Sequence, residues 1–136
     1  MADLSITTTS VFPGSSSIKE NGVAGETLAN GKTVYKKASD GKYWLADSNA
    51  ATAEARVPVG IVLSGGAANQ GVLILKSGHI TIGATVVQGT AYFQSDAPGG
   101  ICPEADVGSG EQPTLIGFAI STTVINVDFQ SAGVLK

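Results

Sequence analysis

The sequence predicts an all-β fold, a small barrel or sandwich, from three observations. The first is that its apolar residues occur in short runs, either alternating with polar residues or continuous, as in strands. The second is that Gly, Pro, Asp and Ser turn signals separate nearly all of these runs. The third is that only Asn49–Arg56 is alanine-rich enough to indicate a helix, and Pro58 ends it.

Two kinds of strand are expected along the chain. Lys32–Lys37 and Lys42–Leu45 flank an Asp40-Gly41 turn, which favours a hairpin because it tolerates positive φ. Continuous apolar runs, typical of strands buried on both faces, are Val57–Ser64, Val72–Lys76 and Leu115–Ser121. Alternating runs, typical of strands with one buried face, are His79–Ile82, Ala91–Ser95 and Thr123–Gln130.

The chain also contains an internal repeat, covering about residues 25–76 and 83–128. The stretch that begins at Gly25 returns 58 positions later at Gly83, with matching glycines and matching strand residues. Val59–Ser64 likewise matches Ile116–Ser121 at an offset of 57. A duplicated β-unit that cannot bury its own sheet face can pair with its copy. We therefore expect two duplicated half-sheets that close on each other with pseudo-twofold symmetry.

Residues 1–17 are expected to form an extended N-terminal arm, and residues 18–136 a single β domain. The first segment is rich in Thr and Ser and ends in a Pro13-Gly14 turn, so it has too few apolar residues for a core. It is either a disordered terminus or an arm that orders on a partner. The candidate contact residues of such an arm are Leu4, Ile6, Val11 and Phe12.

Charge is scarce in this sequence. Charged residues make up 14% of the chain and the formal net charge is −3, which excludes a basic nucleic-acid-binding surface. A typical soluble domain has roughly 25% charged residues. Either the surface is meant to be covered by neighbouring subunits, or the chain is a compact monomer with a Ser/Thr/Gly exterior.

Targeting signals are also missing from the sequence. No apolar run reaches the ~18 residues of a membrane helix, and the start of the chain lacks the basic and apolar regions of a signal peptide. The lone Cys102 cannot form an internal disulfide, in keeping with a reducing compartment. We expect synthesis in a cytoplasm and no membrane partner.

Two segments superficially suggest chemistry. Gly25–Thr33 has glycines and a lysine, but it has five residues between its glycines where a phosphate-binding loop has four, and Glu26 would repel a phosphate. It also leads into a strand and not into a helix whose amides would hold an anion. His79 is the only histidine, and nearby residues supply neither a nucleophile nor further metal ligands.

The remaining reactive groups are isolated as well. Cys102 has no basic residue close by to lower its pKa, and Ser109 lacks the outer glycine of a nucleophile elbow. Asp96, Glu104 and Asp106 lie in a turn-rich region but lack the dense pattern of a calcium loop. We therefore expect no catalytic site, no metal and no cofactor, and a protein that is not an enzyme.

Three segments together resemble one family, the head decoration or capsid cement proteins of tailed bacteriophages. The segments are Gly60–Ala67, Ser77–Gly83 and Tyr92–Asp106; the last is the most specific and leads into Gly117–Asp128. The resemblance covers roughly residues 25–130. It implies a β-rich homotrimer on the outer capsid surface, bridging neighbouring major capsid protein subunits, with an N-terminal arm that reaches the shell or an adjacent subunit.

The hypothesis from the sequence is thus a virion structural protein, made in the cytoplasm of the bacterial host and placed on the outer capsid. The alternative is a β-rich tail or fibre module that binds host-surface glycans. In that alternative Trp44, as an exposed aromatic residue, would stack on a sugar ring.

Overall fold

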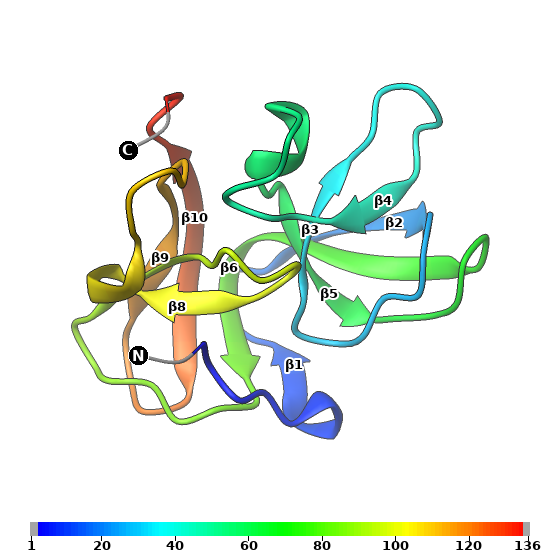
Figure 1. Ribbon diagram of the computed structural model, residues 1–136. Coiled ribbons are helices and arrows are strands. Elements are labelled where there is room, and N and C mark those ends of the chain that lie inside the picture. Colours follow the sequence, from blue (N-terminus) through cyan, green and yellow to red (C-terminus); the bar gives the residue numbers. More distant parts are fainter. Residues whose placement is uncertain (1–2, 135–136) are drawn as a thin grey trace.

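The computed structural model describes residues 3–134 and confirms the all-β fold. A curled antiparallel sheet forms a half-barrel, joined by short 3-10 helices (Figure 1). Residues 1–2 of the expected arm and 135–136 of the expected domain lie outside the described residues. The strands are β1 (Val11–Pro13), β2 (Ile18–Val23), β3 (Thr33–Lys36), β4 (Tyr43–Leu45), β5 (Gly60–Ser64), β6 (Gly71–Ile82), β7 (Ala91–Gln94), β8 (Ile101–Pro103), β9 (Thr114–Ala119) and β10 (Val124–Ser131). The 3-10 helices are η1 (Thr8–Ser10), η2 (Glu54–Arg56) and η3 (Glu104–Asp106).

The strand order is β4-β3-β5-β6-β10-β9-β7-β8, and β1 and β2 also pair with β6. The repeat makes β3 the counterpart of β7, β4 of β8, β5 of β9, and the first half of β6 of β10. Read from either end, the order therefore passes through the same series of counterparts. The 12-residue β6 runs through both halves and is the strand on which they meet (Figure 1). Within residues 3–134 the end strands β4 and β8 do not pair with each other, so hydrogen bonds do not close the sheet into a full barrel.

The two halves also share their strand registers. We call residues 18–76 unit 1 and residues 78–131 unit 2. Val34 pairs with Leu45 and Gly60 in unit 1, and its counterpart Tyr92 pairs with Pro103 and Gly117 in unit 2.

The outer ladder shows that β6 has two roles. Gly22 of β2 pairs with Val72 of β6, and Ile80 of β6 pairs with Ile125 of β10 at the corresponding place. The second half of β6 is therefore the outer strand of unit 2, as β2 is the outer strand of unit 1. The register of the β9–β10 ladder differs from that of its counterpart, the β5–β6 ladder, by two residues.

The buried side chains follow the same duplication. A smaller core belongs to unit 1, and each of its members has a buried counterpart in the main core of the molecule. The unit 1 residues are Ala24, Leu28, Val34, Tyr43, Val62, Val72 and Ile74. Their unit 2 counterparts are Ile82, Val86, Tyr92, Ile101, Ala119, Ile125 and Val127. The repeat in the sequence is thus a repeat of packing as well as of turns.

Two sequence predictions about secondary structure were wrong. Val72–Lys76 and His79–Ile82 were expected to be separate strands, but β6 continues from one to the other through Ser77-Gly78. Gly78 has φ +99°, and a Cβ there would lie 2.3 Å from the Ser16 carbonyl oxygen, so this glycine permits a close crossing of the β1–β2 turn. In Asn49–Arg56 only η2 is helical, because so short a helix is marginal and Asp47 instead holds a turn by accepting the Asn49 amide at 3.2 Å.

Candidate interaction surface

The N-terminal segment is extended, but it lies along the body of its own chain. The Leu4 amide donates to the Ile101 carbonyl at 2.8 Å, and the Thr7 amide donates to the Gly83 carbonyl at 2.8 Å. Leu4 and Ile6 are half-buried and pack against the main core. The strap of residues 3–10 therefore covers β8 and the end of β6.

β1 divides the last two candidate contact residues between the core and the solvent. Val11 pairs with Ile82 and is buried in the main core, so it is not available to a partner in this conformation. Phe12 points to the other side and is 56% exposed. Of the four residues singled out in the sequence, Phe12 is the one that presents a large apolar side chain to solvent.

Phe12 belongs to a row of side chains that crosses the outer side of the sheet. It pairs with Thr81 of β6, and Thr81 pairs with Val124 of β10. The Ile120 amide then donates to the Val124 carbonyl at 2.9 Å, which brings Ile120 to the end of this row. Directly paired residues of antiparallel strands share a face. Ile120 is 42% exposed, so the row ends on solvent at both sides.

A second row lies beside the first. Ala91, Phe118, Asn126 and His79 are paired in that order across β7, β9, β10 and β6. Phe118 is 52% exposed at the middle of the row. We call the two rows together the outer face, formed by Phe12, His79, Thr81, Ala91, Phe118, Ile120, Val124 and Asn126. It contains no Asp, Glu, Lys or Arg.

The positions in unit 1 that correspond to Phe118 and Ile120 are covered. Phe118 and Ile120 of β9 correspond to Ile61 and Leu63 of β5. Ile61 is fully buried and Leu63 nearly so, both in the main core with Val11. On β5 this face of the repeated sheet is thus an internal contact, whereas on β9 it is open to solvent.

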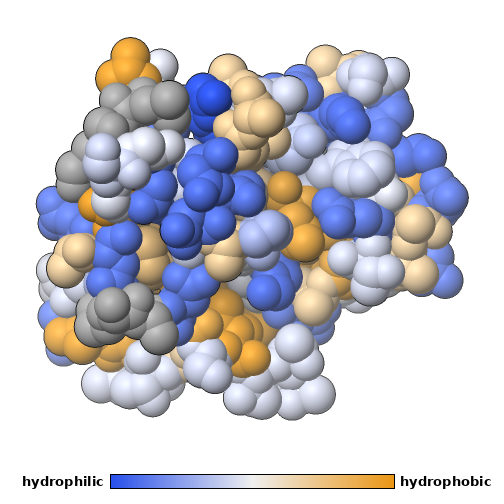
Figure 2. Space-filling model, viewed as in Figure 1, coloured by the Kyte–Doolittle hydropathy of each residue, from blue (hydrophilic) through white to orange (hydrophobic). Residues whose placement is uncertain are grey.

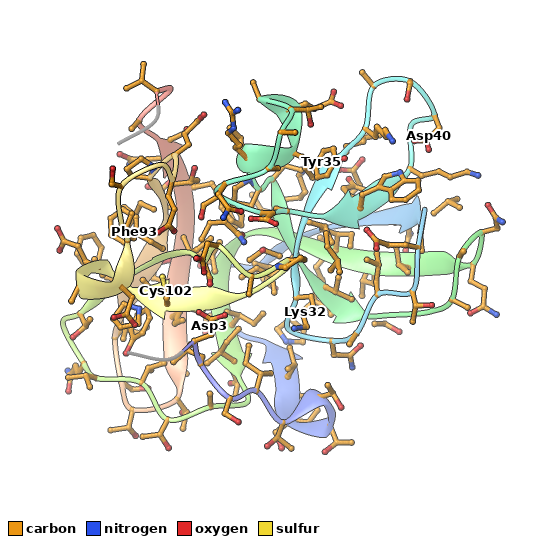
Figure 3. The ribbon with its side chains drawn as sticks, viewed as in Figure 1. Asp3, Lys32, Tyr35, Asp40, Phe93 and Cys102 are labelled. Carbon is orange, nitrogen blue, oxygen red and sulfur yellow. The ribbon has the colours of Figure 1, made fainter. Side chains whose placement is uncertain are left out.

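Elsewhere the surface is mixed. In Figure 2 hydrophilic and hydrophobic residues alternate over the side that faces the viewer, with small apolar areas between polar ones. In Figure 3 Phe93 of β7 lies toward one side of the molecule and Asp40 toward the opposite side. Phe93 pairs with Leu115 beyond a bulge, and both side chains are half-buried beside the outer face.

Trp44 is half-buried, and its polar and aromatic groups already have partners. Its indole N–H donates to the Asp40 carboxylate at 3.1 Å, and the Lys37 ammonium lies 4.5 Å from the ring centre. The ring also packs against Gly25, where a Cβ would lie 2.2 Å from it. The Lys42 amide, and then the indole and nearby lysines, lower the pKa of Asp40. A sugar ring stacking here would have to compete with Lys37.

The junction of the two units is closed by buried polar groups that the sequence analysis missed. The Thr33 hydroxyl donates to Gln94, whose amide donates to the Ala46 carbonyl at 3.0 Å. The Ser48 hydroxyl donates to the Glu111 carboxylate at 2.8 Å. Because these pairs join residues 48 to 63 positions apart, no local pattern could have indicated them. They fix how the β3–β4 and β7–β8 hairpins meet.

The reactive groups considered in the sequence are held in structural positions. Burial raises the pKa of the Cys102 thiol to about 12, so the thiol is protonated and unreactive at neutral pH. The Glu26 carboxylate accepts the Leu45 amide at 3.0 Å, so the loop that resembled a phosphate site braces β4. His79 lies on the outer face, paired with Asn126.

Among residues 3–134 the carboxylates do not form a metal site, and the cavity under the N-terminal strap is small. No group of three or more His, Cys, Asp or Glu side chains there is placed to hold a metal ion, Asp96, Glu104 and Asp106 included. A cavity of about 90 Å³ lies under the strap and is lined in part by Asp3 and Lys32 (Figure 3). It has room for a few water molecules only. Asp3 accepts the Ser95 hydroxyl at 2.6 Å, which ties the strap to the residue that follows β7.

Comparison with known protein families found no family that matches this chain, and comparison with curated proteins found no significantly similar sequence. Among the described residues, no helix has the length and apolar character needed to cross a membrane.

Proposed function

We propose that this protein is a virion structural protein that binds the outer capsid surface of a tailed bacteriophage and stabilises contacts between major capsid protein subunits. It is made in the host cytoplasm and acts as a homotrimer on the shell, with no nucleic-acid or membrane partner. The proposal rests on the resemblance of Tyr92–Asp106 and its flanking segments to capsid cement proteins. The observation that carries it is the outer face, which lacks Asp, Glu, Lys and Arg and exposes the large apolar side chains of Phe12, Phe118 and Ile120.

Such a role needs stiffness and contact area and requires no catalytic group. A filled shell pulls its capsomers apart, and a clamp across each seam opposes that force. A specific contact of ordinary size buries roughly 1,000 Å² or more, and many copies on many seams act together. The duplicated sheet, held at its junction by buried hydrogen bonds, supplies a rigid body for this purpose.

The test is attachment to capsids. Expanded heads that lack the protein are mixed with the purified chain, pelleted and imaged. We expect saturable binding at defined positions on the outer surface, and heads that withstand heating or osmotic shock better than bare heads. Purified virions that lack the protein, or heads that do not retain it, would contradict the proposal.

The glycan-binding alternative depends on Trp44 and is tested separately. If the protein is an adhesion module, it binds sugars on a glycan array and Trp44→Ala abolishes that binding while capsid attachment stays unchanged. The contacts of Trp44 with Asp40, Lys37 and Gly25 favour a structural role, so we expect no Trp44-dependent glycan signal.

A further inference from the structure

We infer that unit 2 contains a groove that binds an extended peptide, and that residues 3–7 of the strap are the peptide bound there. The groove lies between β8 and the end of β6. Its ligand class is an extended segment with a carboxylate followed by apolar residues one and three positions later, as at Asp3, Leu4 and Ile6. The inference goes beyond the capsid role and does not depend on it.

The groove exists because the two units close the outer edge of their hairpins differently. In unit 1 the chain that leaves β2 contacts β4 directly. Ala24 forms a parallel bridge with Tyr43, and the Gly25 amide donates to the Tyr43 carbonyl at 2.8 Å. In unit 2 the carbonyl of Ile101, the counterpart of Tyr43, accepts the Leu4 amide instead. An extended segment from the start of the chain therefore replaces a direct contact.

The second brace of this edge in unit 1 has no equivalent in unit 2. Glu26 accepts the Leu45 amide at 3.0 Å and so holds the end of β4. The counterpart of Leu45 is Pro103, which has no amide hydrogen, and the counterpart of Glu26 is Ala84, which has no carboxylate. Unit 2 thus cannot make this bond, and the strap holds the corresponding edge.

The strap lies in the groove as a bound strand. Leu4 and Ile6 are half-buried against the main core, whereas the residues that follow each of them are exposed, which is the two-residue alternation of a strand. Hydrogen bonds hold its backbone at both ends, to β8 and to the residue after β6. The Asp3 carboxylate accepts the hydroxyl of Ser95, a buried residue. Backbone, apolar and carboxylate contacts together define what the groove recognises.

Glycines let the strap approach the body of the protein closely. A Cβ at Gly83 would lie 2.5 Å from the Thr7 carbonyl oxygen. A Cβ at Gly100, where unit 1 has Lys42, would lie 2.6 Å from the Asp3 carboxylate. A side chain at either glycine would therefore push the strap away. The cavity of about 90 Å³ between strap and body shows that the strap leaves part of the groove unfilled.

The experiment loosens the strap in the full-length protein and supplies it again as a separate peptide. Leu4→Asp places a carboxylate against the main core and should release the strap. Ser5→Asp is the matched control, because it adds the same charge at an exposed position. The readout is the fluorescence anisotropy of a labelled synthetic peptide of residues 3–10, titrated with each protein.

We expect the peptide to bind the Leu4→Asp protein saturably. Binding to the wild type and to Ser5→Asp should be at least tenfold weaker, because a tethered strap competes at a high effective concentration. A peptide that itself carries Leu4→Asp should not bind. A folded Leu4→Asp protein that does not bind the peptide overturns the inference, and so does a wild type that binds it equally well.

A second measurement uses the wild type alone and decides the matter if Leu4→Asp does not fold. In hydrogen exchange, the Leu4 and Thr7 amides should be protected relative to the free peptide and should exchange through a local opening. The Ile82 amide, which donates to the Thr123 carbonyl at 3.0 Å, should exchange more slowly, by unfolding of the whole domain.

Two results of the exchange measurement contradict the inference. If the Leu4 and Thr7 amides exchange as fast as in the free peptide, the groove does not hold the strap. If they exchange only together with Ile82, the strap is not a separable ligand. Retention of the protein by heads is a separate observation, so the groove and the capsid role can fail independently.

Discussion

Unit 1 and unit 2 share strand order, most registers and a matching set of core positions, yet they treat one sheet face in opposite ways. In unit 1 that face is lined by Ile61 and Leu63 and is buried, and in unit 2 it is lined by Phe118 and Ile120 and is open. The duplication thus made two equivalent sets of positions, on β5 and β9, and folding of one chain covers only the set on β5. The apolar side chains at the uncovered positions, Phe118 and Ile120, are therefore left open to solvent.

The largest difference in stability is expected between truncations of two equivalent residues, Ile61 and Phe118. Ile61→Ala should destabilise the fold by about 2–5 kcal/mol, because it leaves a cavity in the main core. Phe118→Ala should change the free energy of unfolding of the monomer by less than about 1 kcal/mol, since Phe118 is half-exposed. Urea unfolding of dilute protein measures both. Equal losses would mean that the two faces are equally buried.

The central glycines of β5 and β9, Gly60 and Gly117, occupy equivalent positions but have different neighbours. A Cβ at Gly60 would lie 2.2 Å from the Cγ2 atom of Ile74, and one at Gly117 would lie 2.0 Å from the Asn126 carbonyl oxygen. Both alanine variants should lose about 1–3 kcal/mol of stability. Gly117→Ala should lose more, because the β10 backbone must move while Ile74 can change rotamer. Thermal unfolding of the two variants compares them, and a milder effect at Gly117 would contradict this reading.

A smaller effect on stability is expected from a substitution at Asp47, whose counterpart in unit 2 is the uncharged Ala105. Burial raises the pKa of Asp47, and the nearby Asp96 and Glu111 raise it further. A raised pKa in the fold means that this residue's contribution to stability is present below the unfolded pKa of about 4 and is lost as pH rises through the folded value.

Asp47→Asn keeps an oxygen that can accept the Asn49 amide while removing the charge. The variant should therefore melt at a higher temperature than the wild type at pH 7, and the gain should disappear below about pH 3. Melting curves across that range make the comparison. A gain that is independent of pH would show that the charge is not its cause.

The smallest effect is expected at an ion pair that only unit 1 has. Lys76 lies 3.5 Å from Glu20 on neighbouring strands and lowers the pKa of Glu20, whereas unit 2 has Phe129 and Gly78 at these positions. Because the pair is exposed, Lys76→Met should cost about 0.2–1 kcal/mol at neutral pH. The loss should vanish in high salt and as pH falls through the pKa of Glu20. Urea unfolding at two salt concentrations tests it.

The sequence predicted those features of the fold that depend on local chemistry. The Asp40-Gly41 hairpin follows from residues close together in the chain, and β3 pairs with β4 as expected. The short strands β1, β2 and β8 were missed because they are edge segments with weak alternation. Their partners on β6 and β7 supply most of the reason that they are strands at all.

The candidate surface was less predictable than the fold. Val59–Ser64 and Ile116–Ser121 have the same apolar pattern, so the sequence could not indicate which face would remain open. That depends on how the units dock, which buried pairs such as Ser48 with Glu111 determine over long separations. Likewise Val11 and Phe12 are equally apolar neighbours, and only the direction of β1 decides which one is buried.

The double membership of β6 has a mechanical consequence. Since one continuous strand serves as an outer strand for one half and an inner strand for the other, neither half keeps a complete sheet if this strand is pulled out. Heating the protein or pulling on this strand therefore disrupts both units together. The molecule is expected to melt in one sharp step and to resist tearing up to a single threshold, with no softening beforehand.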